Sequence, residues 1–354
     1  MNPAQIKSIH FKNFKVLRKA TLPLSRFTLI VGPNGSGKST AMEAISAAAN
    51  PKNKSYDKIL TAVLRDTLDL PSHPTAGQGA TVEVSIDWMV GAAPFTSETK
   101  WLLKGDQVSS SGPYFVDSSG QEIVTHAAQI ARKTLNSFRT FSFNSKELAR
   151  PVQISPQMEL QSSGANLAGV LDDLQNKDNG RFEALNEDLQ KWLPDFDRVL
   201  FDVPNNGQKE ILMRTRSGER IQAEDLSDGT LFALAFLTLA YMPKPPSIVC
   251  FEEPEHGIHP RLLQEIKEGM YRLAYPEGYG DKRAPVQVIA TTHSPYLLDL
   301  YKDHPEQIVI ASKDERGTKF ERLSEMPHLD EFLQDAPLGD VWYSGVLGGV
   351  PIAP

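Results

Sequence analysis

The sequence predicts an α/β fold in which helices cover a mixed β-sheet, and three observations lead to this prediction. Apolar strands alternate with helical segments between residues 247 and 312, which is typical of a parallel sheet with helices on its faces. An apolar strand at 26–31 runs into a glycine-rich loop and then an alanine-rich helix. Residues 81–88 alternate apolar and polar side chains, the pattern of a half-buried strand.

The elements follow in order along the chain. We expect two strands joined by a turn within residues 6–31, the second at 26–31, and a helix after the glycine-rich loop. The strand at 81–88 opens an antiparallel meander that continues at 100–104 and 113–117, with a loop at 105–112. Helical patterns dominate from about 121 to 194, and a strand at 198–203 and a hairpin at 210–223 come next.

The last third of the chain starts with a helix at 227–241 that is apolar all round, has a serine N-cap and is stopped by prolines. Strands at 247–251, 286–293 and 307–312 then alternate with helices. The core sheet is therefore assembled from both ends of one domain spanning 1–354. We expect a discontinuous core of about 1–120 and 195–354, with an inserted, mainly helical lobe of about 121–194.

Composition narrows the class of protein. The 354 residues are 40% hydrophobic and 23% charged, as in ordinary soluble domains. No apolar run reaches membrane-spanning length and no signal-peptide pattern opens the chain, so we expect a cytoplasmic protein without a membrane segment. The lone cysteine, Cys250, excludes an internal disulfide framework and lies within an apolar strand, where a small buried side chain is its simplest interpretation.

The net charge of −7 gives no global basic footprint for nucleic acid. Three local basic clusters are more typical of solvated faces than of a binding track, but they leave direct DNA contact open. They consist of Lys7, Lys12, Lys15, Arg18 and Lys19; of Arg132, Lys133 and Arg139; and of Lys209, Arg214, Arg216 and Arg220.

The segment "GPNGSGKS" fits the pattern G-x-x-x-x-G-K-[ST] and has the strand before it and the helix after it that this pattern requires. Backbone N–H groups of such a loop converge on phosphates, and the helix N-terminus adds positive potential. We expect Lys38 to reach the β- and γ-phosphates and Ser39 to ligate Mg²⁺. The residues expected to bind the nucleotide are Gly32, Pro33, Asn34, Gly35, Ser36, Gly37, Lys38, Ser39 and Thr40.

Two adjacent carboxylates, Glu252 and Glu253, end the apolar strand at 247–251. In a P-loop fold a second strand delivers a carboxylate to Mg²⁺, and a neighbouring acid can activate the attacking water. We therefore assign Glu252 to the metal and Glu253 to the general base. Glutamate replaces the commoner aspartate at 252. The alternative is a pair of surface acids that begin a turn.

Two further polar groups follow the same order. His293, in "TTHSP", ends another apolar strand, where ligand crevices of α/β sheets form, and it is a candidate sensor of the γ-phosphate. Ser227 and Gly229, in "LSDGT", start the apolar helix and form a second candidate anion site. Taken alone, a structural histidine and an ordinary N-cap would be the simpler interpretations. A metal site at His256 and His259 is open from their spacing alone.

The order of these motifs resembles that of ABC-type ATPases. The segments "FKNFK", "GPNGSGKST", "FEEPEHGIHP" and "TTHSPYLLD" are similar to the branch that contains RecF, SMC and OLD proteins. The segments "LSDGTLFALAFLTLAY", "SGANLAGVLDDL" and "LGDVWYSGVLGG" resemble a group of bacterial predicted ATPases in that branch. The resemblance covers nearly the whole chain and implies a P-loop NTPase fold of the ABC/SMC head type.

The resemblance also implies ATP and Mg²⁺ as ligands, and a head-to-tail homodimer that sandwiches two ATP molecules. In that dimer Ser227 and Gly229 of one subunit would contact the γ-phosphate bound to Lys38 of the other, although Asp228 stands where the transporter-type signature has glycine. The turn "EHGIHP" resembles the loop that meets its twin across such a dimer. Gln153 is a candidate for the glutamine that helps to hold Mg²⁺, and Lys12, Asn13 and Phe14 mark the expected adenine region.

The implied setting is DNA repair or anti-phage defence, with a separate effector such as a nuclease and with higher assemblies left open. Residues 40–226 lack the long coiled coil of SMC arms, and the roughly sixty residues after His293 are too few for the nuclease domain of OLD-type ATPases. One alternative is a low-turnover, ATP-bound regulatory scaffold. A transporter ATP-binding subunit is a second alternative, against which the absence of a transporter-type signature argues.

Overall fold

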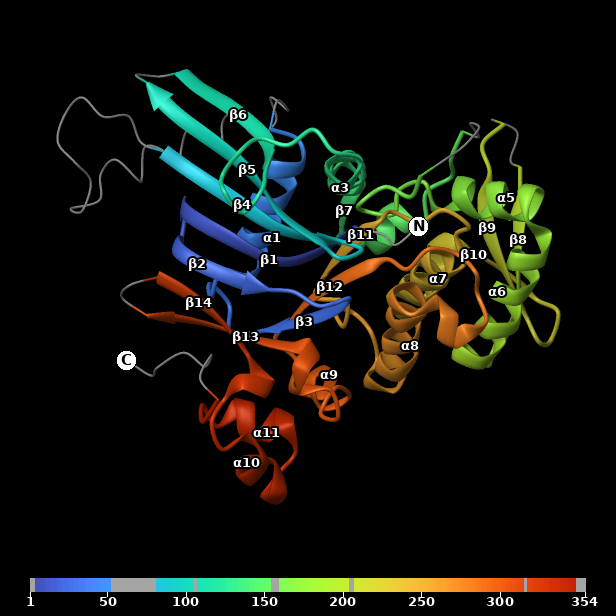
Figure 1. Ribbon diagram of the computed structural model, residues 1–354. Coiled ribbons are helices and arrows are strands. Elements are labelled where there is room, and N and C mark those ends of the chain that lie inside the picture. Colours follow the sequence, from blue (N-terminus) through green and yellow to red (C-terminus); the bar gives the residue numbers. More distant parts are fainter. Residues whose placement is uncertain are drawn as a thin grey trace. The chain divides into compact units, whose positions relative to one another are not determined.

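The computed structural model describes residues 4–51, 81–104, 107–153, 159–203, 207–314 and 317–347 (Figure 1). The chain forms two compact units. Unit 1 comprises Met1–Phe138 and Gln287–Pro354, and unit 2 comprises Arg139–Val286. The expected core of about 1–120 and 195–354 with a lobe inserted at about 121–194 stays a prediction.

An antiparallel sheet forms much of unit 1. Its order is β2-β1-β4-β5-β6, with β1 at Ala4–Phe14, β2 at Leu17–Pro23, β4 at Thr81–Val90, β5 at Ala93–Lys104 and β6 at Gln107–Val116. The alternation in β4 has the expected result, because Val82, Val84, Ile86 and Trp88 are all buried. The Trp88 Nε1–H donates a hydrogen bond of 2.8 Å to Ser97 Oγ in β5, so the buried indole is also satisfied.

Two expectations for this sheet were wrong. Residues 6–31 hold parts of three strands, because β1 and β2 form a hairpin before the chain reaches the next strand. The loop expected at 105–112 is mostly strand: β6 begins at Gln107, and its Ser109, Ser110 and Ser111 pair with residues of β5. Serine and glycine favour loops locally, but here pairing with a long neighbouring strand decides the conformation.

A second sheet of unit 1 contains the parallel strands. β3 at Phe27–Val31 lies between β12 at Gln287–Thr292 and β13 at Ile308–Asp314, and it is parallel to both. β14 at Gly317–Arg322 pairs antiparallel with β13 and completes the order β14-β13-β3-β12 within this unit. The helices of unit 1 are α1 (Lys38–Ala49), α3 (His126–Asn136), α9 (Pro295–Asp299), α10 (Leu329–Asp335) and α11 (Leu338–Tyr343), with 3₁₀ turns η5 (Pro305–Gln307) and η6 (Leu323–Glu325).

Unit 2 packs helices around an apolar centre. Helix α7 (Asp228–Tyr241) is buried at every position from Thr230 to Tyr241, and its Phe236 ring lies 4.9 Å from the ring of Phe251 in β11 (Ile248–Glu252). Phe141 of β7 (Phe138–Phe141) also stacks on Phe251. The remaining elements are α4 (Ser145–Leu148), α5 (Leu167–Lys177), α6 (Asn179–Trp192), β8 (Phe196–Asp202), β9 (Glu210–Thr215), β10 (Arg220–Gln222), η2 (Ala223–Asp225), η3 (Pro260–Leu262), α8 (Leu263–Ala274) and η4 (Pro276–Tyr279).

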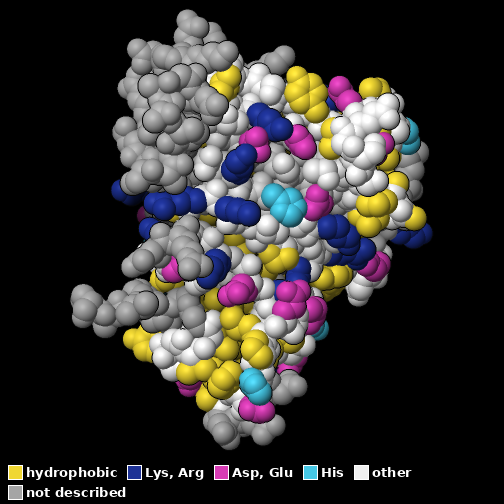
Figure 2. Space-filling model, turned by 60° about the vertical axis from the view of Figure 1, so that its left-hand side comes forward, with side chains coloured by type: hydrophobic (Ala, Val, Ile, Leu, Met, Phe, Trp, Pro, Cys, Tyr) yellow, Lys and Arg dark blue, Asp and Glu magenta, His cyan; other side chains and the backbone are white. Residues whose placement is uncertain are grey.

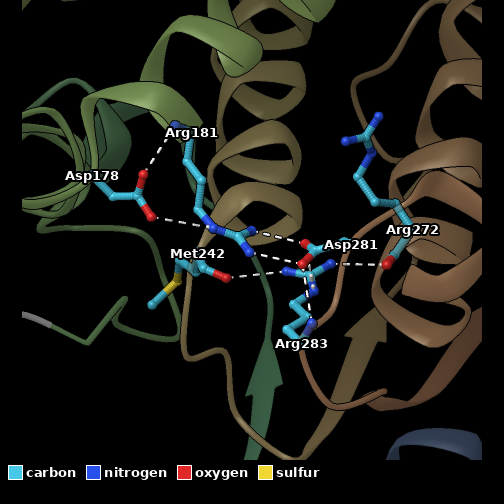
Figure 3. A network of polar contacts seen from close by, with 6 residues as sticks. All are labelled: Asp178, Arg181, Met242, Arg272, Asp281 and Arg283. Carbon is cyan, nitrogen blue, oxygen red and sulfur yellow. Dashed lines mark hydrogen bonds and ion pairs between the residues drawn. The ribbon is translucent and has the colours of Figure 1, made fainter.

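A polar network joins four segments of unit 2, which are α6, the end of α7, α8 and the loop at 281–283 (Figure 3). Arg181 of α6 forms two hydrogen bonds, of 2.8 and 2.7 Å, to the carboxylate of Asp281. Arg283 is almost completely buried and donates to the carbonyls of Met242 (3.1 Å) and Arg272 (2.8 Å). The hydrogen bonds from Arg181 lower the pKa of Asp281 to about 2, and burial lowers the pKa of Arg283 to about 10. The ion pairs of Asp281 with Arg181 and Arg283 therefore stabilise unit 2 only while the carboxylate keeps its charge.

Replacing Asp281 by alanine is expected to lower the free energy of unfolding by about 3–5 kcal/mol, because two arginines lose their carboxylate partner and Arg283 stays buried. Urea unfolding followed by circular dichroism measures this change. Asp195→Ala removes an exposed carboxylate of the same unit and should change stability by less than about 0.5 kcal/mol. Equal effects of the two substitutions would contradict a stabilising role for the network.

The same carboxylate makes unfolding sensitive to acid. Its folded pKa of about 2 lies below the ordinary value of 3.8, so its contribution is complete above about pH 4 and is lost as the pH falls toward 2. The shift corresponds to about 2 kcal/mol. Urea midpoints measured between pH 5 and pH 2 should therefore fall less steeply for Asp281→Asn than for the wild type.

Candidate functional site

The loop between β3 and α1 has the geometry that its glycines predict. All five residues of β3 are buried, and α1 begins at Lys38. Gly35 and Gly37 have φ angles of 78° and 97°, in the left-handed region that favours glycine. A Cβ atom on Gly32 would lie 2.4 Å from the carbonyl oxygen of Ala311 in β13, so no larger residue fits there without movement. The backbone of β13 therefore supports the start of the loop directly.

Lys38 curls back over this loop. Its side chain is 6% exposed, and its Nζ donates to the carbonyl oxygens of Gly32 (2.6 Å) and Pro33 (3.0 Å). The N-cap of α1 is Gly37, which offers no side chain to the first N–H groups of the helix. Ser39, in the first turn, is exposed. An ammonium group, uncapped N–H groups and an accessible hydroxyl together fit a phosphate ligand with a bound Mg²⁺ ion.

The end of β12 lies beside the loop in the same unit. In the parallel register Thr292 is opposite Val31, and the N–H of Gly32 donates to the carbonyl of Thr292 at 3.4 Å. His293 follows immediately and is exposed. Ser294 then caps α9 by accepting a hydrogen bond from the N–H of Leu297. The structure thus brings His293 to the edge of the sheet from which the phosphate loop also starts.

The "FKNFK" segment also lies next to α1, through a contact that the sequence did not predict. Lys15, in the turn between β1 and β2, forms an ion pair of 2.5 Å with Glu43 of α1. Asn13, near the end of β1, has a φ of 60° and donates through its side chain to the carbonyl of Thr81. This turn is therefore fixed to the helix that follows the phosphate loop, while an adenine contact there stays a prediction.

The other candidate residues belong to unit 2. Ser227 caps α7 as expected, accepting a hydrogen bond of 3.2 Å from the N–H of Thr230. Asp228 is exposed, and a Cβ atom on Gly229 would lie 3.6 Å from the carbonyl oxygen of Gly257. The start of α7 therefore packs beside the turn that follows β11, so two of the motifs found in the sequence share one surface of unit 2.

The two glutamates have different backbones. Glu252 is the last residue of β11, whereas Glu253 leaves the strand with a φ of 46°, a left-handed conformation uncommon for glutamate. Both side chains are half-buried. The nearby Cys250 is fully buried, and burial together with the charge of Glu252 raises the pKa of its thiol, as a structural cysteine requires. The left-handed backbone of Glu253 is a local strain of the kind that is typical of functional turns.

The candidate residues are thus divided between the units. Unit 1 holds the phosphate loop and His293, and unit 2 holds Ser227, Gly229, Glu252 and Glu253. Gln153 is exposed in unit 2. Within the described ranges no group of three or more His, Cys, Asp or Glu side chains could hold a metal ion by itself, and His259 Nδ1 accepts a hydrogen bond from the N–H of Arg261.

Two family models match the sequence and together include the motifs described above up to residue 299, but not the tail segment "LGDVWYSGVLGG". One, described as "AAA domain, putative AbiEii toxin, Type IV TA system", matches residues 95–299, more than half of the chain. The chain belongs to this family of AAA domains. A second, described as "AAA ATPase domain", matches residues 5–86 of this AAA protein and includes the phosphate loop. The chain is thus an ATPase of the AAA class. None of the curated proteins matches its sequence.

Three solved structures that are similar to this AAA protein are heads of Smc proteins. An Smc head bound to the C-winged helix domain of ScpA has a TM-score of 0.58 at 17% identity, over 89% of this chain and 97% of that one. The Smc head of Pyrococcus furiosus, bound to the C-terminal domain of ScpA, gives 0.60 at 16% identity, over 94% and 100%. That of Pyrococcus yayanosii gives 0.53 at 13%, over 94% and 100%. The predicted P-loop fold of the ABC/SMC head type is confirmed.

Part of the prediction concerned the membrane. In the described ranges, none of the helices combines the length and the apolar character that a membrane crossing needs.

Proposed function

We propose that this AAA protein binds Mg·ATP at its phosphate loop, dimerises around the nucleotide and uses hydrolysis to control a separate effector protein. The observation that carries the proposal is the complete loop between β3 and α1. Its Lys38 ammonium is buried and held over the loop, and the helix behind it begins without a side-chain cap. An anion with several phosphates would be attracted to both the ammonium group and the helix N-terminus.

The residues take complementary roles in this proposal. Lys38 stabilises the charge that develops on the transferred phosphoryl group, and Ser39 together with Glu252 would hold Mg²⁺, which supplies further positive charge there. Glu253 takes a proton from the attacking water as general base. His293 contacts the γ-phosphate from the end of β12, and its exposed position next to the loop supports this role.

The homodimer would complete the site. The start of α7 in one subunit would approach the γ-phosphate bound to Lys38 of the other, with Ser227 and Gly229 as contacts. The half-exposed Gly229 and the exposed Ser227 support this, since both are accessible to a second molecule. The adjacent Asp228 carboxylate would repel phosphate unless it pointed away. At the first turn of α7 it is instead favourably placed against the helix dipole.

The names of similar proteins support the proposed setting. The matching family carries the names of an AbiEii toxin and a type IV TA system, and the similar Smc heads were solved with a separate protein, ScpA. The family name supports a role in defence, and the Smc heads support control through a protein partner, while a role in DNA repair stays an expectation from the resemblance. Direct DNA contact is a weaker component of the proposal, because basic side chains of the clusters are already paired. Examples are Lys12 with Glu83, Lys209 with Asp172 and Arg214 with Asp197.

Figure 2 also supports a minor role for direct DNA contact. On the face shown, Lys and Arg side chains are interspersed with Asp and Glu rather than gathered into a continuous basic patch. Such a surface gives little counterion release on DNA, so we expect weak, salt-sensitive binding at most.

A regulatory scaffold with little turnover is the second candidate. Glutamate in place of the commoner aspartate at 252 and the exposed carboxylate of Asp228 favour it, since both depart from the commonest ABC pattern. In that case ATP would mainly keep a complex closed.

Phosphate release from Mg·ATP tests the proposal, measured with and without duplex DNA at several protein concentrations. We expect a rate per subunit that rises with concentration, as a dimeric site requires, and little response to DNA. Stoichiometric retention of ATP without phosphate release would favour the scaffold. A strong stimulation by DNA would show that DNA itself is the trigger.

A further inference from the structure

The hairpin of β13 and β14 forms the support of the phosphate loop. Ala311 of β13 lies against Gly32, as described above, and Thr318 of β14 lies against Gly37 at the other end of the loop. A Cβ atom on Gly37 would be 2.7 Å from Thr318 Oγ1 and 3.2 Å from Leu17 Cδ2. Thr318 is held in place from its backbone, because its N–H donates to the carbonyl of Val16 at 3.3 Å. Both strands of the hairpin therefore touch the loop.

The hydroxyl of Thr318 has no hydrogen-bond partner among the described residues, although the residue is only 2% exposed. The hydroxyl of Ser36, which lies inside the loop and is 1% exposed, also has no hydrogen-bond partner among the described residues. Buried hydroxyl groups are rarely left unpaired, because each loses its hydrogen bonds to water. Two of them lie on either side of the Gly37 N-cap, and a second arrangement of the loop could satisfy them.

Phosphate binding provides a physical reason for such an arrangement. A phosphate draws the N–H groups of the loop toward itself. The peptide unit is planar and trans, so a carbonyl points away from the ligand when the N–H of the same peptide points toward it. On the side of Gly37 away from the phosphate lies the Thr318 hydroxyl, which can donate a hydrogen bond to such a carbonyl.

We propose that Thr318 is a positioning residue for the nucleotide, whose hydroxyl donates a hydrogen bond to the Gly37 end of the loop only when phosphates are bound. The inference rests on the proposed nucleotide site. Thr318 does not touch the nucleotide and acts through the loop. A bond that forms only in the loaded state raises affinity, whereas the unpaired hydroxyl costs stability in the ligand-free state.

The experiment measures two quantities for Thr318→Val and Thr318→Ser. These are the melting temperature without ligand and the Kd for ADP and for a non-hydrolysable ATP analogue. Valine keeps the shape and removes the hydroxyl, so we expect an equal or higher melting temperature together with about fivefold weaker binding. Serine keeps the hydroxyl and should bind within about twofold of the wild type. A purely structural role would not weaken binding while leaving the melting temperature equal or higher.

Thr140→Val is the matched control. Its hydroxyl is also buried without a partner, but it belongs to β7 of unit 2. This variant should resemble Thr318→Val in melting temperature and the wild type in affinity.

Wild-type affinity in Thr318→Val would overturn the inference and leave the proposed function intact. A wild-type protein that binds no nucleotide would overturn the proposed function and the inference with it. If the valine variant does not fold, Thr318→Ser against Thr318→Ala decides: weaker binding by the alanine variant supports the inference, and equal binding overturns it.

Discussion

Lys38→Ala is expected to abolish productive nucleotide binding and to lower the rate of ATP hydrolysis by at least about 100-fold. In the ligand-free protein the ammonium group has the carbonyls of Gly32 and Pro33 as acceptors, so its charge is held at the loop before any ligand arrives. Alanine removes the only side-chain cation of the loop, and the remaining N–H groups cannot replace a full charge. Equilibrium binding of ADP and steady-state phosphate release measure the two effects.

Lys191→Ala is a suitable control for this experiment. Lys191 is largely exposed and pairs with Asp188 on the surface of α6, so its loss should leave both quantities within about twofold of the wild type. Hydrolysis by Lys38→Ala at a rate close to that of the wild type would mean that the loop does not bind the reacting phosphates. The proposed function would then lose the observation that carries it.

The sequence predicts the phosphate loop and its flanking strand and helix well, because the signals for them are local. The four apolar residues of β3, the glycines at 35 and 37 and the alanine-rich stretch of α1 each favour their own conformation locally. The same holds for the start of α7, where the Ser227 side chain caps the helix within three residues of itself. Hydrogen bonds and backbone preferences of this kind depend on neighbours in the sequence.

Other features depend on residues that are distant in the sequence. The serines of β6 become a strand because β5 pairs with them, although serine by itself favours a loop. Thr318 meets Gly37 because β13 and β14 return to the phosphate loop near the end of the chain. A single threonine in a short strand gives no signal for such a contact. The buried network around Asp281 and Arg283 was missed for the same reason.

The roles of the site residues lie between these cases. The residue types at 38, 39, 252, 253 and 293 follow from motif order, and the structure places the loop beside His293 in unit 1 and Ser227 and Gly229 beside the Gly257 turn in unit 2. Catalysis depends on distances of about 3 Å between the reacting groups. Those roles therefore stay predictions, which substitution can test one residue at a time.

Glu253→Gln is expected to keep ATP bound and to lower turnover by about 10²- to 10⁴-fold. The amide has nearly the shape of the carboxylate but cannot accept the proton of the attacking water. The backbone should not change, since the Glu253 carbonyl keeps its hydrogen bond from the N–H of His256 and glutamine meets the same strain as glutamate at a φ of 46°. Single-turnover phosphate release and filter binding of ATP separate the chemical step from binding.

Glu219→Gln gives the matched control, because Glu219 is exposed at the hairpin between β9 and β10 and its substitution should not alter turnover. Retention of ATP with turnover lost only in Glu253→Gln would support the assignment of the general base, and the trapped complex would then be the form in which to look for the dimer and its partner. Normal turnover by Glu253→Gln would remove Glu253 from that role. If Glu253→Gln lost ATP binding as well, the carboxylate would be needed to hold the ligand, and Glu252 would become the candidate base.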